Sequence, residues 1–460
     1  MTASRAVRVV VDSVLRVPVA DLVGDEESAL RAQFRYPNPA FAQAQKTGRD
    51  VRFIPATLTT TREENGVLLL PRGATRLIRA ALPGARFVDR RQRLADVAFA
   101  LAGTLRDYQT AAVSEAMRRQ QGALVAPTGS GKTTIGCALI AAARQPALVL
   151  VPTVDLAEQW VERIRLSLGI EASCCTGGAF EIAAVTVATI PTVSRPERLS
   201  VIASAFGLVI FDEAHHVVAD TFAAVANACA ARYRFGLTAT PERGDGRGPL
   251  LEHFLGGIIH EVTIADLTRS GMLAEPRFVT VPTEMAFAYG SAKDWPALLS
   301  ALVVDASRNE MIVGAVAREC RGGVTGLILT GRVEHALALA EMLRARGLRC
   351  AALVGTMSKR ERSKALEQLR SGELDAVVAT SLADEGLDVP RLSRLFLAFP
   401  GKSESKLTQR IGRVLRPHPD KGTPLVFDFV DTRIGVLAHQ ARKRAALFAK
   451  LWGNGSQEAA

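Results

Sequence analysis

The sequence predicts an α/β protein in which two parallel-sheet domains follow one another, preceded by a small N-terminal α+β domain. From residue 104 onward, short apolar runs alternate with helical segments, and this alternation occurs in two consecutive series. Residues 1–103 lack the alternation. The chain has 460 residues, 48% of them hydrophobic, which is enough to bury two or three cores.

Each series supplies the strands of one sheet. In the first series we expect strands at Ala123–Ala126, Ala147–Val151, Ala184–Ala188, Leu208–Phe211 and Phe235–Thr238. In the second we expect them at Gly326–Thr330, Cys350–Val354, Ala376–Ala379, Leu395–Ala398 and Pro424–Phe429. Helical segments separate the strands, for example Lys132–Arg144, Asp155–Leu168 and Val333–Arg346.

The same pattern sets the predicted domain boundaries. We expect an accessory domain, with DNA recognition as a candidate role, at 1–103 and a first sheet domain at 104–257. A connector with small helices follows at 258–311, then a second sheet domain at 312–435 and a C-terminal helix and tail at 436–460. The amphipathic run Arg433–Trp452 predicts that last helix.

The termini and cysteines indicate a cytoplasmic protein. The N-terminal apolar run is broken by Asp12, Arg16 and Asp21, so we expect neither a secretory signal nor a membrane span. The six cysteines, at positions 137, 174, 175, 229, 320 and 350, show no C-x-x-C spacing. This argues against a zinc ribbon and fits a reducing compartment.

The net charge of +11 is concentrated at the two ends of the chain. Residues 1–103 carry 16 basic and 10 acidic side chains, and residues 401–460 carry 11 and 5, so the middle is close to neutral. A polyanionic partner is one explanation. A generally basic, arginine-rich proteome is the other, and charge alone does not decide between them.

A glycine-rich loop follows the first apolar strand and opens a helix. Its backbone N–H groups can approach phosphates, and the helix N-terminus adds the positive end of a dipole. Lys132 can reach the β- and γ-phosphates, and the Thr133 hydroxyl can bind Mg²⁺. The loop therefore predicts a nucleotide site formed by Pro127, Thr128, Gly129, Ser130, Gly131, Lys132, Thr133 and Thr134.

Two adjacent carboxylates, Asp212 and Glu213, end the apolar run Leu208–Phe211. Such a pair at a strand end can divide the work of holding Mg²⁺ and of orienting or deprotonating water. We assign Asp212 to the metal and Glu213 to the water. In isolation the pair would suit a helix cap, but the phosphate loop favours catalysis.

These motifs resemble a known family. Asp212-Glu213-Ala214-His215, Thr238-Ala239-Thr240 and the segment Gln409–Arg416 resemble the superfamily 2 helicases of the DEAH type. Over about residues 104–435 the motifs stand in the family's order and are most similar to the XPB-like and phage UvsW-like branch, with a core of the type III restriction kind. The resemblance implies two tandem RecA-like domains.

The resemblance also implies roles for individual residues. Arg413 and Arg416 match arginine fingers, which are worth roughly 10³–10⁵ in rate where they act. Gln409 is the third catalytic residue that the second domain supplies. Nucleotide contacts outside the phosphate loop are implied for Arg106 and Gln109, near adenine, and for Gly386 and Asp388, from the second domain.

Coupling and strand contacts follow from the same resemblance. Thr238 and Thr240 would relay the state of the γ-phosphate, and His215 would bridge towards Gln409. Turn-capping threonines and a core histidine are the alternatives. The nucleic-acid strand would run over loops that contain Pro152 and Thr330 and the contact residues Thr153, Gln159, Thr189, Arg332 and Thr380. For each contact residue, an ordinary surface position is the alternative.

Two segments are less informative. Arg243-Gly244-Asp245 stands where XPB-like proteins have Arg-Glu-Asp, with Gly in place of the central Glu. In the N-terminal domain, aromatics at Phe34, Tyr36 and Phe41 are interleaved with Arg31, Arg35 and Arg52. They suit base stacking and phosphate contacts, or a small core with solvated arginines.

The resemblance therefore implies an ATP- and Mg²⁺-dependent DNA helicase or translocase, moving 3′ to 5′, in DNA repair, recombination or phage defence. The motifs leave open an RNA helicase, and an ATP-gated binding subunit that never separates strands. No nuclease constellation is evident, so any cutting would need a nuclease, repair or defence partner.

Overall fold

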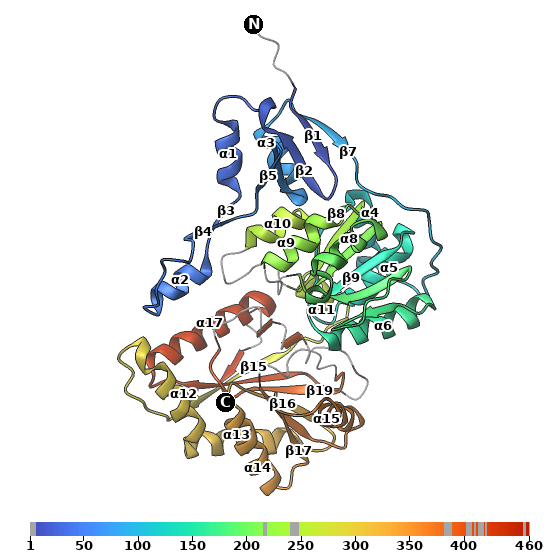
Figure 1. Cartoon of the computed structure of the whole chain (residues 1–460). Coiled ribbons are helices and arrows are strands. Elements are labelled where there is room, and N and C mark those ends of the chain that lie inside the picture. The colour runs from blue at the N-terminus through green and yellow to red at the C-terminus, as the bar shows by residue number, and fades with distance from the viewer. Residues whose placement is uncertain are drawn as a thin grey trace. The chain divides into compact units, whose positions relative to one another are not determined.

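The computed structural model describes residues 6–214, 219–239, 248–380, 389–401, 407–408, 411–412, 418, 421–453 and 457–459 (Figure 1). Strands in this part of the chain form two seven-stranded sheets, a five-stranded sheet and a two-stranded sheet. This confirms the predicted fold class of two RecA-like parallel-sheet domains with a small N-terminal α+β domain.

By its contacts the chain divides into two compact units. The first unit contains residues 1–126 and 131–262, and the second contains 127–130 and 263–460. Within the described segments, no helix has the length and apolar composition needed to cross a bilayer.

The N-terminal domain is a mixed sheet covered by helices. Its strand order is β5-β6-β2-β1-β7, and only the β1–β7 pair is parallel. Alternating residues such as Val9, Leu15 and Leu70 are buried against Leu30 and Ile78 of the helices. The elements are β1 (Arg8–Val11), β2 (Val14–Pro18), α1 (Glu26–Gln33), β3 (Arg35–Pro37), α2 (Pro39–Lys46), β4 (Thr57–Thr59), β5 (Arg62–Glu64), β6 (Val67–Pro71), α3 (Thr75–Ala81) and β7 (Arg86–Asp89).

The first parallel sheet has the order β10-β11-β9-β12-β13-β8-β14. Its central strands read as unbroken apolar runs because helices cover both faces. The strands are β8 (Gln121–Val125), β9 (Ala147–Val151), β10 (Ser173–Cys175), β11 (Val185–Thr189), β12 (Leu208–Asp212), β13 (Tyr233–Thr238) and β14 (Ile258–Glu261). The helices are α4 (Asp107–Arg119), α5 (Lys132–Ala143), α6 (Val154–Leu168), α7 (Ile190–Val193), α8 (Pro196–Ala205), α9 (Ala219–Ala228) and α10 (Gly248–Leu255). Helix α11 (Ile264–Arg269) follows β14 along the chain and belongs to the second unit.

The second parallel sheet has the order β17-β18-β16-β19-β20-β15-β21. The segment 258–311, predicted to be a connector with small helices, also contributes a strand to this sheet, since β15 pairs with β20. The strands are β15 (Arg277–Thr283), β16 (Thr325–Thr330), β17 (Cys350–Leu353), β18 (Ala376–Thr380), β19 (Leu392–Leu397), β20 (Leu425–Asp431) and β21 (Gln457–Ala459). The helices are α12 (Trp295–Val304), α13 (Ala306–Glu319), α14 (Val333–Ala345), α15 (Lys359–Ser371) and α17 (Gly435–Trp452).

Two buried arginines fix the N-terminal domain to the first parallel sheet. Arg72, just after β6, donates to the Ala231 carbonyl at 2.7 Å and to Oε1 of Gln121 at 3.0 Å. Arg234, on β13, donates to the carbonyl of Ser13 at 3.1 Å. Burial lowers the pKa of Arg234 to about 10 and that of Arg72 well below its usual value. Their partners are backbone and amide oxygens of both domains, so separating the domains would break these bonds.

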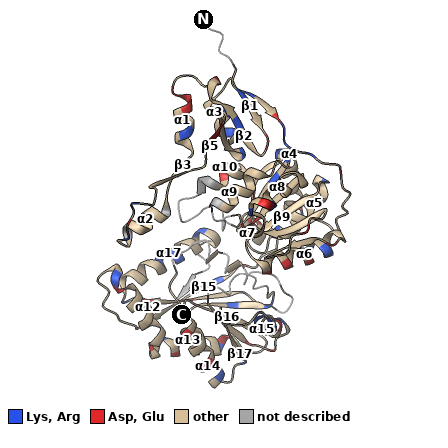
Figure 2. Ribbon diagram, viewed as in Figure 1, with Lys and Arg blue, Asp and Glu red and all other residues tan. Residues whose placement is uncertain are grey.

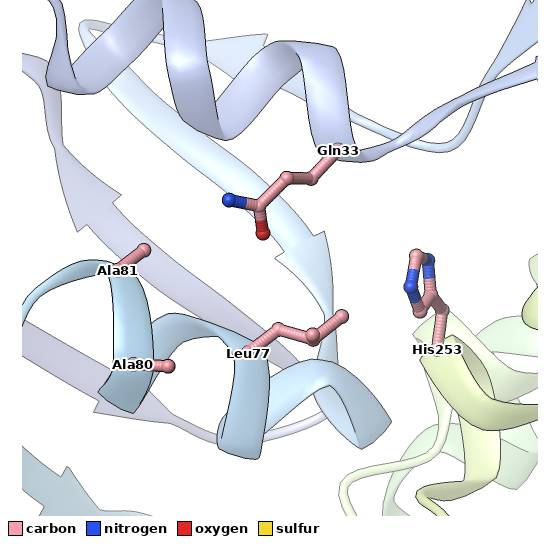
Figure 3. Close-up of a pocket in the computed structure, with 5 residues that line it drawn as sticks. All are labelled: Gln33, Leu77, Ala80, Ala81 and His253. Atoms are coloured by element: carbon pink, nitrogen blue, oxygen red, sulfur yellow. The ribbon is translucent and has the colours of Figure 1, made fainter.

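A pocket of about 460 Å³ opens beside this contact. Figure 3 shows Gln33, Leu77 and His253 facing it from three different helices. The hydroxyl of Tyr36 is hydrogen-bonded to Nδ1 of His253, which links β3 to α10. The pocket belongs to the domain contact and not to the phosphate loop.

Replacing Gly73 should weaken this contact. A Cβ at Gly73 would lie 2.3 Å from the amide nitrogen of Gly256 and 2.6 Å from two carbonyl oxygens of α10, so the backbones must separate. We expect Gly73→Ala to lower the free energy of unfolding by about 1–3 kcal/mol, measured by denaturant unfolding. Gly84→Ala is the matched control, because a Cβ at Gly84 meets nothing within 4 Å. Equal stability of the two variants would contradict the close approach.

Candidate functional site

The phosphate loop connects β8 to α5 at the carboxyl edge of the first parallel sheet. Gly129 and Gly131 have φ angles of +91° and +79°, which residues with a Cβ adopt only with strain. Lys132 begins α5, and its Nζ donates to the Ala126 carbonyl at 3.2 Å. Thr133 and Thr134 follow in the first helical turn and are half-buried. The loop thus presents amides, an ammonium group and hydroxyls together.

The two carboxylates lie at the same edge. Asp212 ends β12, and in the sheet register it lies beside Leu237 of β13, while Thr238 of β13 lies beside Val125 of β8. The amide of Ala126 donates to the Thr238 carbonyl at 2.9 Å, which ties the loop to β13. Oε1 of Glu213 is 3.9 Å from Nζ of Lys132. The structure therefore brings together the loop, the carboxylates and Thr238.

Asp212 is held in a fixed orientation. Its Oδ1 accepts the Glu213 amide at 3.0 Å, and its Oδ2 accepts Nε1–H of Trp160 at 2.7 Å. Burial, and then the charge of Glu213, raises the pKa of Asp212 to about 6. A bound cation would favour the charged form, since an opposite charge lowers a carboxyl pKa.

Glu213 has a left-handed backbone, with φ of +47°. A non-glycine residue in this region is uncommon, and such residues cluster at active sites. The conformation turns the chain directly after Asp212. It gives the second carboxylate a direction different from the one a continued strand would impose.

Gln109 lies against the phosphate loop. Its Oε1 accepts the Arg106 amide at 3.1 Å at the start of α4, and a Cβ on Gly131 would lie 2.7 Å from its Nε2. The Arg106 guanidinium donates to the Tyr108 hydroxyl at 3.2 Å. These residues lie where an adenine contact is expected, and that role stays a prediction.

The group as a whole fits a nucleoside triphosphate with Mg²⁺. Amides at a helix N-terminus and a lysine suit phosphates. A threonine hydroxyl and a carboxylate are the oxygen ligands that Mg²⁺ prefers. A Cβ at Gly131 would crowd the Gln109 side chain. Glycine at this position therefore leaves room for phosphates to approach the backbone closely.

Several predicted site residues lie outside the described part of the chain. These are His215, Thr240, Gly386, Asp388, Gln409, Arg413 and Arg416, together with the segment 243–245. Their roles remain predictions.

The predicted strand contacts of the first unit gather at neighbouring strand ends. Thr189 ends β11 and lies beside Val151, the last residue of β9. Thr153 follows β9 and caps α6, with its Oγ1 accepting the Leu156 amide at 3.3 Å. Gln159 is exposed on α6. Thr189 is buried and its hydroxyl is bonded to that of Thr192 at 2.8 Å, so it is less available than Gln159.

The contacts of the second unit form a similar group. Thr330 and Thr380 lie opposite each other at the ends of β16 and β18, and Arg332 is half-buried at the start of α14. The Thr330 hydroxyl is 2.7 Å from Nδ1 of the buried His335. It is therefore engaged inside the protein, and Arg332 is the more accessible group.

The His335 hydrogen bonds continue as a directed chain. Asn309 donates its amide to the Val303 carbonyl at 2.8 Å, so its Oδ1 is the acceptor for Nε2–H of His335 at 2.9 Å. Nδ1 of His335 then accepts the Thr330 hydroxyl proton. This chain joins the strand end at Thr330 to the end of α12.

Sequence reasoning missed Trp160. The helix spacing of Ala157, Trp160 and Ile164 indicates only a core face, and all three are buried. The one available signal in the sequence was that a buried tryptophan N–H usually finds a hydrogen-bond acceptor. In this fold the partner is Asp212.

Of the two interpretations of Phe34 and Tyr36, base stacking does not fit the structure, and a place in the core does. Both side chains are buried in the first unit, where Phe34 packs against the ring of His253 with centroids 4.8 Å apart. Figure 2 shows acidic groups beside the basic ones in this domain. Arg31 pairs with Glu27 and Glu63, and Arg52 pairs with Asp50.

Two family models match the chain. Residues 102–243 match "Type III restriction enzyme, res subunit", and residues 309–418 match "Helicase conserved C-terminal domain". The matches fall on the two parallel-sheet domains.

The chain is also similar to named helicases and translocases and to solved structures. The chain is 28% identical over 347 residues to the DNA 3'-5' translocase XPB2 of Sulfurisphaera tokodaii, covering 68% of this chain and 78% of that protein. It is 30% identical over 342 residues to the DNA 3'-5' helicase XPB of Kineococcus radiotolerans, covering 71% of this chain but only 59% of that longer protein. Among solved structures, a fragment of a putative HsdR subunit of a type I restriction enzyme from Vibrio vulnificus has a TM-score of 0.61 at 18% identity, covering 78% of this chain and 69% of that one. The last likeness supports the fold alone.

Replacing Gly131 should impair nucleotide binding specifically. Alanine there must adopt φ of +79° and also displaces the Gln109 amide. We expect Gly131→Ala to weaken binding of a fluorescent ATP analogue by roughly tenfold or more, because small misplacements of a site are costly. Gly169→Ala is the control, since its φ of +65° carries similar strain but a Cβ there meets nothing within 4 Å. Similar affinities for the two variants would count against the proposed site.

His335 should make the protein less stable as the pH falls. Burial, and then the charge of Arg308, lowers the pKa of His335 to about 4, whereas an unfolded histidine has a pKa near 6.5. The unfolded chain therefore takes up the proton first. This contribution is fully present above pH 6.5 and is lost progressively towards pH 4, up to about 3 kcal/mol.

Other groups titrate in the same range, so variants must isolate His335. Burial also lowers the pKa of His253 to about 4, which adds to the loss, while the raised pKa of Asp212 opposes it. Denaturant unfolding between pH 7 and pH 4 should show a smaller decrease for His335→Gln than for the wild type. The exposed His439→Gln should follow the wild type. Parallel profiles for His335→Gln and the wild type would refute this assignment.

Proposed function

We propose that this chain, which belongs to the XPB-like branch of the superfamily 2 helicases, uses ATP hydrolysis to move along DNA and to separate or remodel its strands. The observation that carries the proposal is the joint placement of the phosphate loop, Asp212–Glu213 and Thr238 at one sheet edge. A second parallel-sheet domain with a helicase match follows in the same chain.

Each group in the first unit has a distinct task in this proposal. The loop amides and Lys132 bind the phosphates, and Gln109 and Arg106 hold the base. Thr133 and Asp212 hold Mg²⁺, which when bound supplies charge neutralisation at the phosphates. Glu213 orients a water molecule and accepts its proton, and its position near Lys132 keeps it beside the phosphate groups.

The second domain makes hydrolysis depend on the state of the motor. Arg413 and Arg416 would stabilise the charge that develops on the γ-phosphate, and Gly386 and Asp388 would contact the nucleotide. Gln409 with His215, and Thr238 with Thr240, would transmit the change to the strand contacts. Thr153, Gln159, Thr189, Arg332 and Thr380 would hold the sugar–phosphate backbone without reading bases, as movement over any sequence requires.

DNA is the proposed substrate. Both curated relatives described above are DNA motors by name, and the basic ends of this chain favour a polyanion. The cellular setting would be DNA repair, recombination or phage defence, with nuclease, repair or defence proteins as partners. The proposed direction of movement is 3′ to 5′.

One experiment tests the substrate and the activity together. ATPase stimulation and strand displacement are measured with single-stranded, duplex and forked DNA and with RNA–DNA hybrids. We expect stimulation by DNA and displacement of a forked strand. Stronger stimulation by RNA would favour an RNA helicase, and stimulation without displacement on any substrate would favour an ATP-gated binding subunit.

Variants of the ATP site should separate binding from hydrolysis. We expect Lys132→Ala to lose both, and Glu213→Gln to lose hydrolysis by at least about 10²-fold while still binding ATP. Arg416→Ala should lose hydrolysis by about 10³-fold or more and keep most ATP binding, measured by equilibrium titration. The exposed Lys293→Ala serves as control. Normal hydrolysis by Arg416→Ala would disprove the role of the second domain.

A further inference from the structure

Trp160 joins three elements of the first unit. It projects from α6, its Nε1–H donates to Oδ2 of Asp212 at 2.7 Å, and its six-membered ring lies against Gly136 of α5. A Cβ on Gly136 would be 2.3 Å from the ring, so there is no space between the ring and the helix. The indole therefore cannot change rotamer without moving the helix that begins at Lys132.

Helix α6, which carries Trp160, also carries predicted contacts with the nucleic-acid strand. Thr153 caps its N-terminus, and Gln159, the neighbour of Trp160, is exposed while Trp160 is buried. Successive residues point about 100° apart around a helix, so one face meets solvent and the next the core. Helix α6 has 15 residues, begins at the Thr153 cap and ends at the left-handed Gly169, so Gln159 and Trp160 lie on one continuous helix.

We infer that Trp160 is a positioning residue that transmits the state of the DNA strand on α6 to the carboxylate that holds Mg²⁺. The inference rests on the proposed function, because it takes Thr153 and Gln159 as strand contacts and Asp212 as a metal ligand. A displacement of α6 carries the indole N–H with it. Asp212 must follow or lose one of its two donors, and either change alters the metal site.

The indole N–H is the group to remove. Trp160→Phe keeps an aromatic ring and loses the donor, while Trp160→3-benzothienylalanine also keeps the bicyclic volume, so a cavity cannot explain its effect. Partners that orient a metal ligand are typically worth 10–100-fold in metal affinity or activity. We therefore expect both variants to need a 10–100-fold higher Mg²⁺ concentration for half-maximal binding of an ATP analogue, measured by equilibrium titration with Mg²⁺.

The ratio of ATPase activity with single-stranded DNA to activity without it distinguishes a loss of coupling from a general loss of activity. In both variants, ATPase stimulation by single-stranded DNA should fall by a larger factor than ATPase activity without DNA. Trp452→Phe, on the C-terminal helix of the second unit, is the matched control and should behave as the wild type. Equal losses with and without DNA, with Mg²⁺ dependence of binding unchanged, would overturn the inference.

Fluorescence gives a readout that does not depend on hydrolysis. The chain has three tryptophans, so Trp295→Phe combined with Trp452→Phe leaves Trp160 as the sole reporter. Adding single-stranded DNA without nucleotide should change its emission, at concentrations where a labelled oligonucleotide shows binding by anisotropy. Bound DNA with unchanged Trp160 emission would overturn the inference.

Different results would refute the proposed function and the role of Trp160. If the wild type binds no DNA and shows no stimulation, the proposed function is wrong. If the wild type is stimulated by DNA and the two Trp160 variants are stimulated equally well, the function stands and the role of Trp160 is wrong.

Discussion

The bond between Trp160 and Asp212 holds a carboxylate where burial works against its charge. Two donors, the indole and the Glu213 amide, fix both carboxylate oxygens. Even so, burial and the neighbouring Glu213 raise the pKa of Asp212. The two donors therefore fix the orientation of a carboxylate whose charged form a bound divalent cation would favour.

The contact between the N-terminal domain and the first parallel sheet also contains buried charged groups, and here backbone and amide oxygens stabilise them. Arg72 and Arg234 are buried, and their guanidinium groups donate to carbonyl and amide oxygens, which for Arg234 include the carbonyls of Ala226 and Cys229. Burying an unpaired charge is expensive, so losing these bonds would destabilise the contact between the domain and the sheet. The domain consequently behaves as part of the first unit. The bond from Arg234 to the Ser13 carbonyl joins this domain directly to β13, the strand that ends at Thr238.

Local motifs were predictable from the sequence because each is set by adjacent residues. The phosphate loop, the strand before Asp212 and the helix ending at Trp452 appear where the pattern placed them. The edge strands β10 and β14, of three and four residues, were missed because such short runs carry little periodicity. Strand β15, which lies between β20 and β21, was missed because its segment was assigned to the connector.

Contacts between distant residues were not predictable in the same way. The aromatics at Phe34 and Tyr36 gave a surface-binding pattern, yet helix α10, more than two hundred residues later, covers them. Trp160 and Asp212 are likewise 52 residues apart, and the spacing of Trp160 indicated only a core face. A single sequence shows which residues are apolar but not which distant polar group a buried N–H will meet.

The buried side-chain hydrogen bonds described in both units make each unit more rigid. In the first unit a single bond runs from α6 to Asp212, and in the second a chain runs from Thr330 through His335 and Asn309 to the end of α12. Directional bonds in a close-packed interior resist deformation more than apolar contacts alone, because each has one satisfying geometry. In the proposed function, this rigidity would limit how much of the free energy of hydrolysis is absorbed within either unit.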